Sequence, residues 1–206
     1  GRTTLQIGQE QVARVVNKTG GNLLESQYKV VSIQSATGQR LSVNLAIGNS
    51  EAGSFDTLGI VTEDIAVNQE GYITTYGLVR EINTTGALQG ENWNDGDLLF
   101  LSPFVSGSLT KVKPDAPNHG VRMGYVVYSH AIHGTIWVKV DNGYELDELH
   151  GVQITSVANN DLLQYDSTSG LWKNESLSNA GIEPTIANGT TLQYFRGDKT
   201  FVTLPI

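Results

Sequence analysis

The feature that most constrains this chain is a unit that occurs twice near its C-terminus, at residues 163–172 and 192–201. The two copies align without a gap, and each has an apolar-aromatic arm, a polar turn that contains Gly, and a second aromatic arm. The aromatic positions are Tyr165 and Trp172 in the first copy and Tyr194 and Phe201 in the second. Each copy therefore predicts a short β-hairpin. One such hairpin cannot bury its own apolar side, so it needs neighbours from the same chain or from other chains.

Length and charge limit the partners of the protein. The 206 residues suffice for one domain of ordinary size and an appendage, and we expect them to be a piece or a processed product of a longer protein. The formal net charge is -8, and the 13 Lys and Arg residues are scattered. Nucleic acid and anionic membrane surfaces are therefore not expected as partners, because both are bound by clustered cations. Membrane insertion is not expected either, because no apolar run approaches the roughly 20 residues of a spanning helix.

The first part of the chain predicts an all-β domain, a β-barrel or sandwich over residues 1–143. Short runs rich in Val, Ile, Thr and Tyr are separated by Gly, Asn, Asp and Ser, as strands and turns are. The predicted strands are residues 11–17, 28–34, 41–45, 58–61, 72–79, 98–101, 109–112, 121–128 and 135–140. Many short strands at this spacing favour a barrel or a sandwich, and closure into a barrel removes exposed sheet edges.

Strand 72–79 shows the alternation most clearly. Its two expected faces are Tyr72, Thr74, Tyr76 and Leu78 on one side and Ile73, Thr75 and Val79 on the other. Gly77 permits a bulge or a close approach of another strand.

The composition changes after residue 143. An acidic connector, residues 144–150, contains Leu146 and Leu149, which could share one side of a single helical turn. Residues 151–206 are rich in Asn, Ser, Thr and Gly and hold too little apolar mass for a core of their own. They nevertheless keep the aromatic pairs of the repeat, which disordered segments usually lack. We therefore expect this segment to be ordered by other chains.

The motifs of enzymes and metal sites are missing from the sequence. There is no nucleophile elbow, phosphate-binding loop or His-Glu-x-x-His motif, and there is no Cys. We therefore predict that the protein is not an enzyme and has no catalytic residue, cofactor or metal. Glu91, Asp95 and Asp97 could hold calcium, but a β-turn at Asp95 explains them more simply. His130 and His133 would leave a zinc site short of ligands, so a hairpin turn is the simpler interpretation.

Aromatic rings could form a platform for sugar, because an exposed ring can stack on a pyranose. The candidates are Trp93, Trp137 and Trp172. Trp93 lies in a polar loop, residues 90–96, so it is the ring expected to be exposed and the candidate for a glycan contact. Trp137 alternates within a strand pattern, and packing in a core or an interface is the simpler role for all three rings.

Several stretches of the chain carry a resemblance to a known family. They are GIVTEDI (59–65), EGYITTYGLVR (70–80), DGDLLFLS (95–102), APNH (116–119), VRMGYVV (121–127), NGYELDELH (142–150) and NGTTLQYFRGDKT (188–200). The first six resemble a domain of tail-fibre and other virion proteins of tailed bacteriophages, and the last resembles the shaft repeats of trimeric phage fibres. The resemblance covers about residues 8–206. It implies a β-barrel attachment domain followed by a fibre-shaft segment.

This resemblance implies a structural role in the virion. The expected protein is a tail or neck fibre protein whose barrel docks the fibre and whose residues 151–206 begin the shaft. The implied partners are further copies of the chain, other virion structural proteins and, as an open alternative, host surface glycan. The other functions that we consider are a glycan-binding (receptor-binding) module that uses Trp93 and a capsid decoration protein that shares the barrel.

A parallel homotrimer is the expected assembly of the segment after His150. A fibre has one particle end and one distal end, which parallel chains with cyclic symmetry provide. The resemblance to shaft repeats implies three chains. The predicted interface residues are Tyr165, Trp172, Ile182, Ile186, Leu192, Tyr194 and Phe201.

Overall fold

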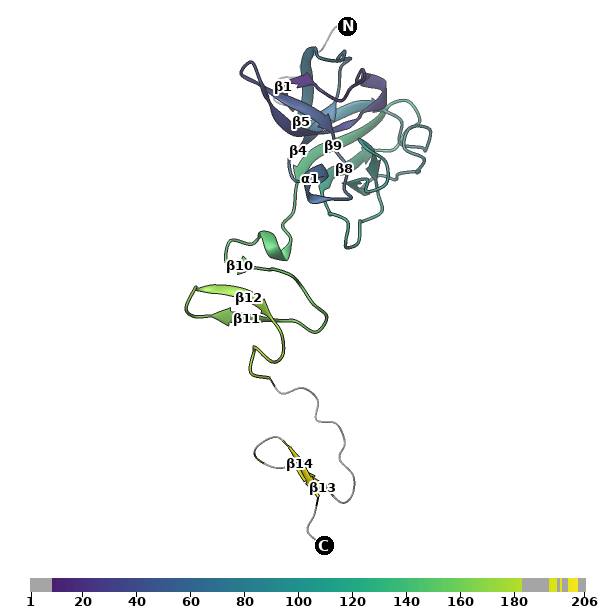
Figure 1. Ribbon diagram of the computed structural model, residues 1–206. Helices are drawn as coiled ribbons and strands as arrows, with labels where there is room; N and C mark the ends of the chain where they lie inside the picture. Colours follow the sequence, from purple (N-terminus) through teal and green to yellow (C-terminus); the bar gives the residue numbers. More distant parts are fainter. Residues whose placement is uncertain (1–8, 183–192, 196, 198–199, 204–206) are drawn as a thin grey trace. The chain divides into compact units, whose positions relative to one another are not determined.

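The computed structural model describes residues 9–182, 193–195, 197 and 200–203. The described chain is predominantly β and contains one large sheet, so the all-β prediction is confirmed. The chain divides into two compact units, residues 1–143 and residues 144–206 (Figure 1).

The first unit is built on a nine-stranded sheet. Its strands are β1 Glu10–Asn17, β2 Val30–Thr37, β3 Arg40–Leu45, β4 Thr57–Val61, β5 Glu70–Ile82, β6 Leu98–Leu101, β7 Leu109–Thr110, β8 Arg122–Tyr128 and β9 Gly134–Asp141. The order in the sheet is β1-β3-β2-β4-β5-β9-β8-β6-β7. Because β1 also pairs with β5, the pairings from β1 through β3, β2, β4 and β5 return to β1 and close a circuit. A short helix, α1 Glu51–Ser54, and a 3-10 turn, η1 Glu25–Gln27, join strands of this circuit.

All nine predicted strands are present, with ends that differ from the predicted ones by at most three residues, and local hydrogen bonds explain two of these differences. β2 begins at Val30 because Tyr28 adopts a φ of 46° and closes η1, donating its N–H to the Glu25 carbonyl at 3.1 Å. β7 ends at Thr110 because the N–H of Val112 donates to the hydroxyl of Thr110 at 3.1 Å. Side-chain and turn hydrogen bonds thus replace strand pairing at these positions.

Two clusters of buried apolar side chains form the core of the first unit. The larger cluster includes Trp93, Leu99, Leu101, Met123, Val126 and Ile136. The smaller one consists of Val15, Leu23, Val31, Val43, Val61, Ile65 and Ile73. Burial of these side chains is the main favourable contribution to the stability of the unit.

Strand β5 alternates largely as predicted. Tyr72 and Tyr76 are exposed on one face, whereas Ile73 is buried on the other. Thr74 is the exception, since it is fully buried and its hydroxyl hydrogen-bonds to that of Thr62 at 2.9 Å. Gly77 allows a close approach, because a Cβ at this position would lie 2.1 Å from the carbonyl oxygen of residue 9.

Candidate functional site

The first predicted hairpin is present in the second unit as part of a three-stranded sheet. The strands are β10 Val152–Gln153, β11 Leu162–Asp166 and β12 Leu171–Glu175, in the order β10-β12-β11. Tyr165 lies opposite Trp172, and their ring centroids are 5.6 Å apart. A single 3-10 turn, η2 Leu146–Glu148, precedes this sheet, as expected for the connector.

The second predicted hairpin is also present, but with a different register. Strand β13 Gln193–Phe195 pairs with β14 Phe201–Thr203, so that Tyr194 lies opposite Val202. In the first hairpin the equivalent Tyr165 lies opposite Trp172. The strand pairs enclose residues 167–170 in the first hairpin and residues 196–200 in the second, and this extra residue shifts the pairing. The two copies therefore align in sequence without a gap, but equivalent residues do not have equivalent partners in the opposite strand.

The three-stranded sheet has two chemically different faces. Because side chains alternate along strands and paired residues share a face, Val152, Leu163, Tyr165 and Trp172 lie on one side, together with Asn174, the partner of Leu163. We call the first four of these residues the apolar face. Leu163 is 43% exposed, Tyr165 52% and Trp172 47%. An apolar surface left half in water on one side of a sheet is typical of a face that another molecule covers.

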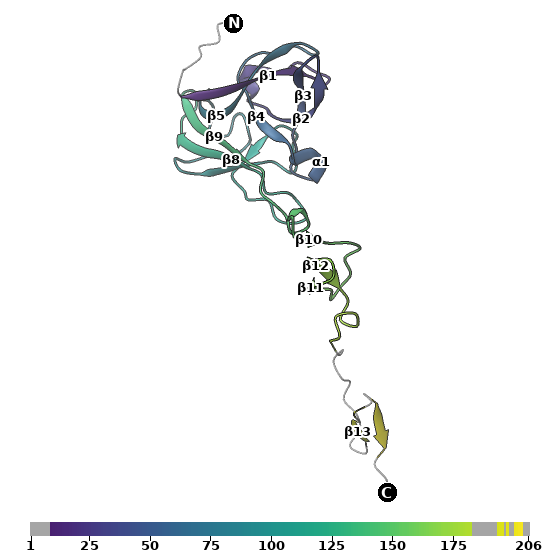
Figure 2. The same ribbon diagram turned by 90° about the vertical axis from the view of Figure 1, so that its left-hand side faces the viewer.

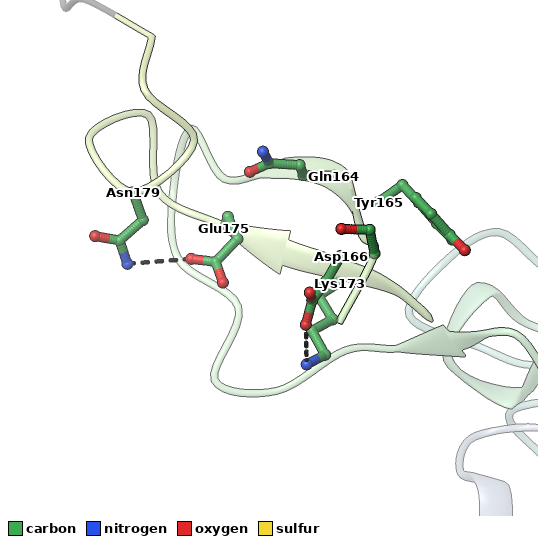
Figure 3. A pocket seen from close by; sticks show the side chains of 7 residues that line it. Gln164, Tyr165, Asp166, Lys173, Glu175 and Asn179 are labelled. Carbon is green, nitrogen blue, oxygen red and sulfur yellow. Dashed lines mark hydrogen bonds and ion pairs between the residues drawn. The ribbon is translucent and has the colours of Figure 1, made fainter. Parts of the chain in front are cut away.

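The opposite face, which we call the polar face, carries Gln164, Asp166, Lys173 and Glu175, and also the part-buried Leu162 and Leu171. An open hollow of about 520 Å³ lies at the hairpin (Figure 3). Its lining residues are Gln164, Tyr165, Asp166, Ser167, Lys173, Glu175 and Asn179. The ammonium of Lys173 hydrogen-bonds to Asp166 at 2.7 Å, and the amide of Asn179 donates to Glu175 at 3.1 Å. These groups bind one another across the hairpin and its turn.

The Asp166 carboxylate fixes the turn of the first hairpin. Hydrogen bonds from Lys173, from the hydroxyl of Ser169 and from the backbone N–H of Thr168 hold its pKa well below the usual range. The carboxylate is therefore ionised at neutral pH and serves as an acceptor for the turn. This role is structural and does not require a bound ligand.

The predicted interface residues are found in different places. Tyr165 and Trp172 contact each other on the apolar face, whereas Ile182 is 49% exposed and donates its N–H to the Leu177 carbonyl. Tyr194 is 46% exposed on β13, and Phe201 is part-buried on β14. The remaining two, Ile186 and Leu192, lie outside the described residues.

Sequence reasoning did not include Leu163 and Val152 among the interface residues. Leu163 is two positions before Tyr165 in the same strand, so the period of two would have placed it on the same face. Val152 gives no comparable signal, because its place on this face depends on the parallel pairing of β10 with β12.

The expectation that Trp93 is exposed is wrong, so the ring is not available to glycan, and the simpler role of packing in a core is confirmed for it. Its side chain is 1% exposed and belongs to the core of the first unit. The loop is polar, but hydrogen bonds attach its backbone to the rest of the first unit. The Trp93 N–H donates to the Thr84 carbonyl at 2.8 Å, and the Ser129 hydroxyl donates to the Trp93 carbonyl at 2.6 Å. The indole N–H donates to Glu91 at 3.1 Å, which satisfies the one polar group of the ring.

The acidic loop next to Trp93 uses its carboxylates as hydrogen-bond acceptors. Asp95 accepts from the N–H of Ser129 at 2.5 Å, and Asp97 accepts from the N–H of Asn94 at 2.9 Å. The N–H of Asp97 also donates to the Asn94 carbonyl, which closes the predicted β-turn around Asp95. Within the described residues, His, Asp and Glu side chains form no group of three that could hold a metal ion.

The two histidines of the β8–β9 connection form a turn, as the simpler interpretation predicted. The Nδ1 atom of His130 accepts the backbone N–H groups of Ile132 and His133 at 3.1 and 2.9 Å. The His133 Nδ1 lies 2.7 Å from a Glu81 carboxylate oxygen. Because the Nδ1 lone pair of His130 is engaged, the proton of the neutral ring resides on Nε2, and neither nitrogen is then a free metal ligand.

Glu91 joins the Trp93 loop to β7. Its carboxylate accepts hydrogen bonds from the Thr110 hydroxyl at 2.6 Å, the Lys111 N–H at 2.8 Å and the Trp93 indole. Burial raises the pKa of this carboxyl, but these hydrogen bonds outweigh burial, so its pKa is lowered. The stabilisation is therefore complete above the ordinary pKa of 4.5 and is lost as the pH falls through the folded-state pKa.

Glu91→Gln is expected to lower the free energy of unfolding of the first unit by about 1–3 kcal/mol at pH 7. The substitution replaces one of the two accepting carboxylate oxygens by an NH₂ group, which then faces hydrogen-bond donors and cannot accept from them. Thermal unfolding measures the loss. Glu25→Gln is the matched control, since it makes the same change at an exposed side chain. Equal unfolding temperatures for the two variants would contradict this role of Glu91.

The chain matches no protein-family model and no curated protein sequence. None of the helices in the part of the chain that the structure describes is long and apolar enough to cross a membrane.

Proposed function

We propose that this protein is a structural component of a tailed-phage virion, a tail or neck fibre protein. Its first unit is a β-barrel that docks the fibre on other virion proteins, and residues 151–206 begin a homotrimeric shaft. The observation that carries the proposal is the apolar face of the second unit, formed by Val152, Leu163, Tyr165 and Trp172. The closed circuit of strand pairings through β1 and β5 supports the barrel.

Self-association explains why Leu163, Tyr165 and Trp172 are left half in water on one face of this sheet. Three parallel copies around an axis bring three apolar faces together, and the polar faces with Asp166 and Lys173 remain in water. Each contact is small, but symmetry multiplies it, so the assembled shaft is stable although a single hairpin is not. The role of the protein is thus mechanical: it holds the fibre rigid and fixes it to the particle.

The proposed role is not enzymatic. The charged side chains in the hollow of the second unit have partners within it: Lys173 donates to Asp166, and Glu175 accepts from the amide of Asn179. Depolymerase activity of the purified chain on capsular polysaccharide would contradict the proposal, because carboxylates from several chains can build such a site.

Light scattering on the purified chain tests the assembly. We expect a particle of three times the mass of one chain at micromolar concentration, because the apolar face stays half in water in the monomer. A stable monomer in which residues 151–182 give folded NMR signals would exclude the homotrimer.

Imaging of the intact particle tests the location. Density for this chain in the tail or the neck supports a fibre protein. Density spread over the capsid surface would instead identify a decoration protein.

A further inference from the structure

A row of aromatic and apolar side chains crosses the outer face of strands β5, β9 and β8, which lie side by side (Figure 2). Tyr125 on β8 is in register with Trp137 on β9, and Trp137 is in register with Leu78 on β5. Tyr76 packs its ring against Trp137 in a T-shaped contact, with centroids 5.1 Å apart. We call Tyr76, Leu78, Trp137 and Tyr125 the aromatic row. It faces away from the core, because the flanking Val126 and Val138 are buried.

The backbone fixes the spacing of the row. Neighbouring strands in a sheet lie about 4.8 Å apart, so Tyr125 and Trp137 are adjacent positions of one surface. Gly124 brings β8 close to β9: its φ is 145°, and a Cβ there would lie 1.8 Å from the Trp137 carbonyl oxygen. The T-shaped contact with Tyr76 further limits the rotation of the indole. A ligand therefore meets a surface that is ordered before binding, which lowers the entropic cost of binding.

The polar groups of the row are available to a ligand. Within the described residues, the indole N–H of Trp137 and the hydroxyls of Tyr76 and Tyr125 have no hydrogen-bond partner, and the indole nitrogen of Trp137 is not a buried atom. Tyr125 is 46% exposed and Tyr76 40%. Lys139 is in register with Tyr76 and is exposed. The row thus combines apolar ring faces with hydrogen-bond donors at their edges.

We propose that the aromatic row is a binding platform for a carbohydrate chain. The rings of Trp137 and Tyr125 cover the C–H faces of pyranose rings, and the indole N–H and Lys139 donate to hydroxyls at the sugar edges. Nucleic acid also stacks on aromatic rings, but the net charge of -8 repels its phosphates. A protein partner would remove water from Lys139 and the three ring donors, each of which would then need its own acceptor. A sugar carries a hydroxyl on nearly every ring carbon and supplies those acceptors.

The platform is independent of the shaft and of the Trp93 loop. Trp93 is buried, and every residue of the aromatic row belongs to the first unit. Loss of the oligomer would therefore weaken only the avidity of binding, whereas loss of the row would abolish sugar binding and leave the oligomer intact.

Binding of the full chain to an array of immobilised neutral, amino and uronic-acid oligosaccharides tests the proposal. We expect the wild-type chain to bind, and Tyr125→Ala and Tyr76→Ala each to weaken binding about tenfold or more, as substitution of a central aromatic anchor does. Trp137→Phe keeps a ring but removes the N–H donor, so we expect a smaller loss. Thermal unfolding of each variant confirms that the first unit remains folded.

Phe104→Ala is the matched control, since Phe104 is the most exposed aromatic of the first unit at 84% and lies outside the row. Its binding should equal that of the wild type. The proposal is overturned if the wild-type chain binds no oligosaccharide, if folded Tyr125→Ala and Tyr76→Ala bind as the wild type does, or if Phe104→Ala weakens binding equally.

Discussion

Leu99→Asp is expected to unfold the first unit. Leu99 is 1% exposed in the larger core cluster, on β6 beside the buried Phe100. An aspartate there would place a carboxylate among apolar side chains with no cation to pair with, which costs several kcal/mol. A loss of about 4 kcal/mol or more removes most of the stability of a domain near the lower end of the usual 5–15 kcal/mol range. Near-ultraviolet circular dichroism and thermal unfolding of the purified variant measure the loss.

A neighbouring pair of residues on β8 provides the control. Val126 is 2% exposed in the same cluster, and Val127 is 49% exposed in the same strand. Val126→Asp should unfold the unit as Leu99→Asp does, whereas Val127→Asp should change the unfolding temperature little. A soluble Val126→Asp or Leu99→Asp variant with an unchanged unfolding temperature would show that the core is misplaced.

The strands of the first unit could be predicted from the sequence because the signals for them are local. Three signals can be recognised within a few positions of the sequence: runs of β-branched and aromatic residues, alternation of apolar and polar residues with a period of two, and Gly, Asn or Asp at the turns. The same holds for both hairpins, whose arms and turns lie within one short repeat. The partner of Tyr194 was not predictable, because one additional residue in the turn shifts every pair across it.

Trp93 shows what local reasoning lacks. Its neighbours in the sequence are polar, which favours exposure. The ring is nevertheless buried, because the polar groups of the loop form hydrogen bonds with residues that are distant in the sequence. Glu91 is bound by Thr110 and Lys111, and the Trp93 carbonyl by Ser129. These partners are many positions away in the sequence, and only the folded sheet brings them to the loop.

The aromatic row could not be predicted from the sequence either, because its residues come together only in the folded sheet. Trp137 and Tyr125 come from neighbouring strands, but Tyr76 comes from β5, far earlier in the chain. The register also depends on irregularities in the pairing of β8 with β9, on either side of Tyr125. A periodic pattern within one strand cannot show which rings lie side by side across three strands.

Trp172→Ala is expected to dissociate the homotrimer and leave the first unit folded. Trp172 is 47% exposed at the centre of the apolar face, beside Tyr165 and in register with Val152. Truncation of a central Trp in an interface commonly costs about 2 kcal/mol or more, and in a symmetric trimer every chain loses the same contact. Light scattering should therefore report a shift from trimer to monomer at micromolar concentration. Thermal unfolding of the first unit should match that of the wild type, because Trp172 belongs to the other unit.

Gln164→Ala separates an interface effect from damage to the hairpin. Gln164 is in the same strand as Tyr165, but its side chain lies on the polar face and lines the hollow. If the apolar face forms the interface, Gln164→Ala remains trimeric, Tyr165→Ala dissociates as Trp172→Ala does, and both aromatic variants keep a folded first unit. A Trp172→Ala chain that stays trimeric, or a Gln164→Ala chain that dissociates equally, would show that the chains associate through another surface. The position of the rings on one face of β11 and β12, opposite the Asp166–Lys173 pair, is the reason for expecting the first outcome.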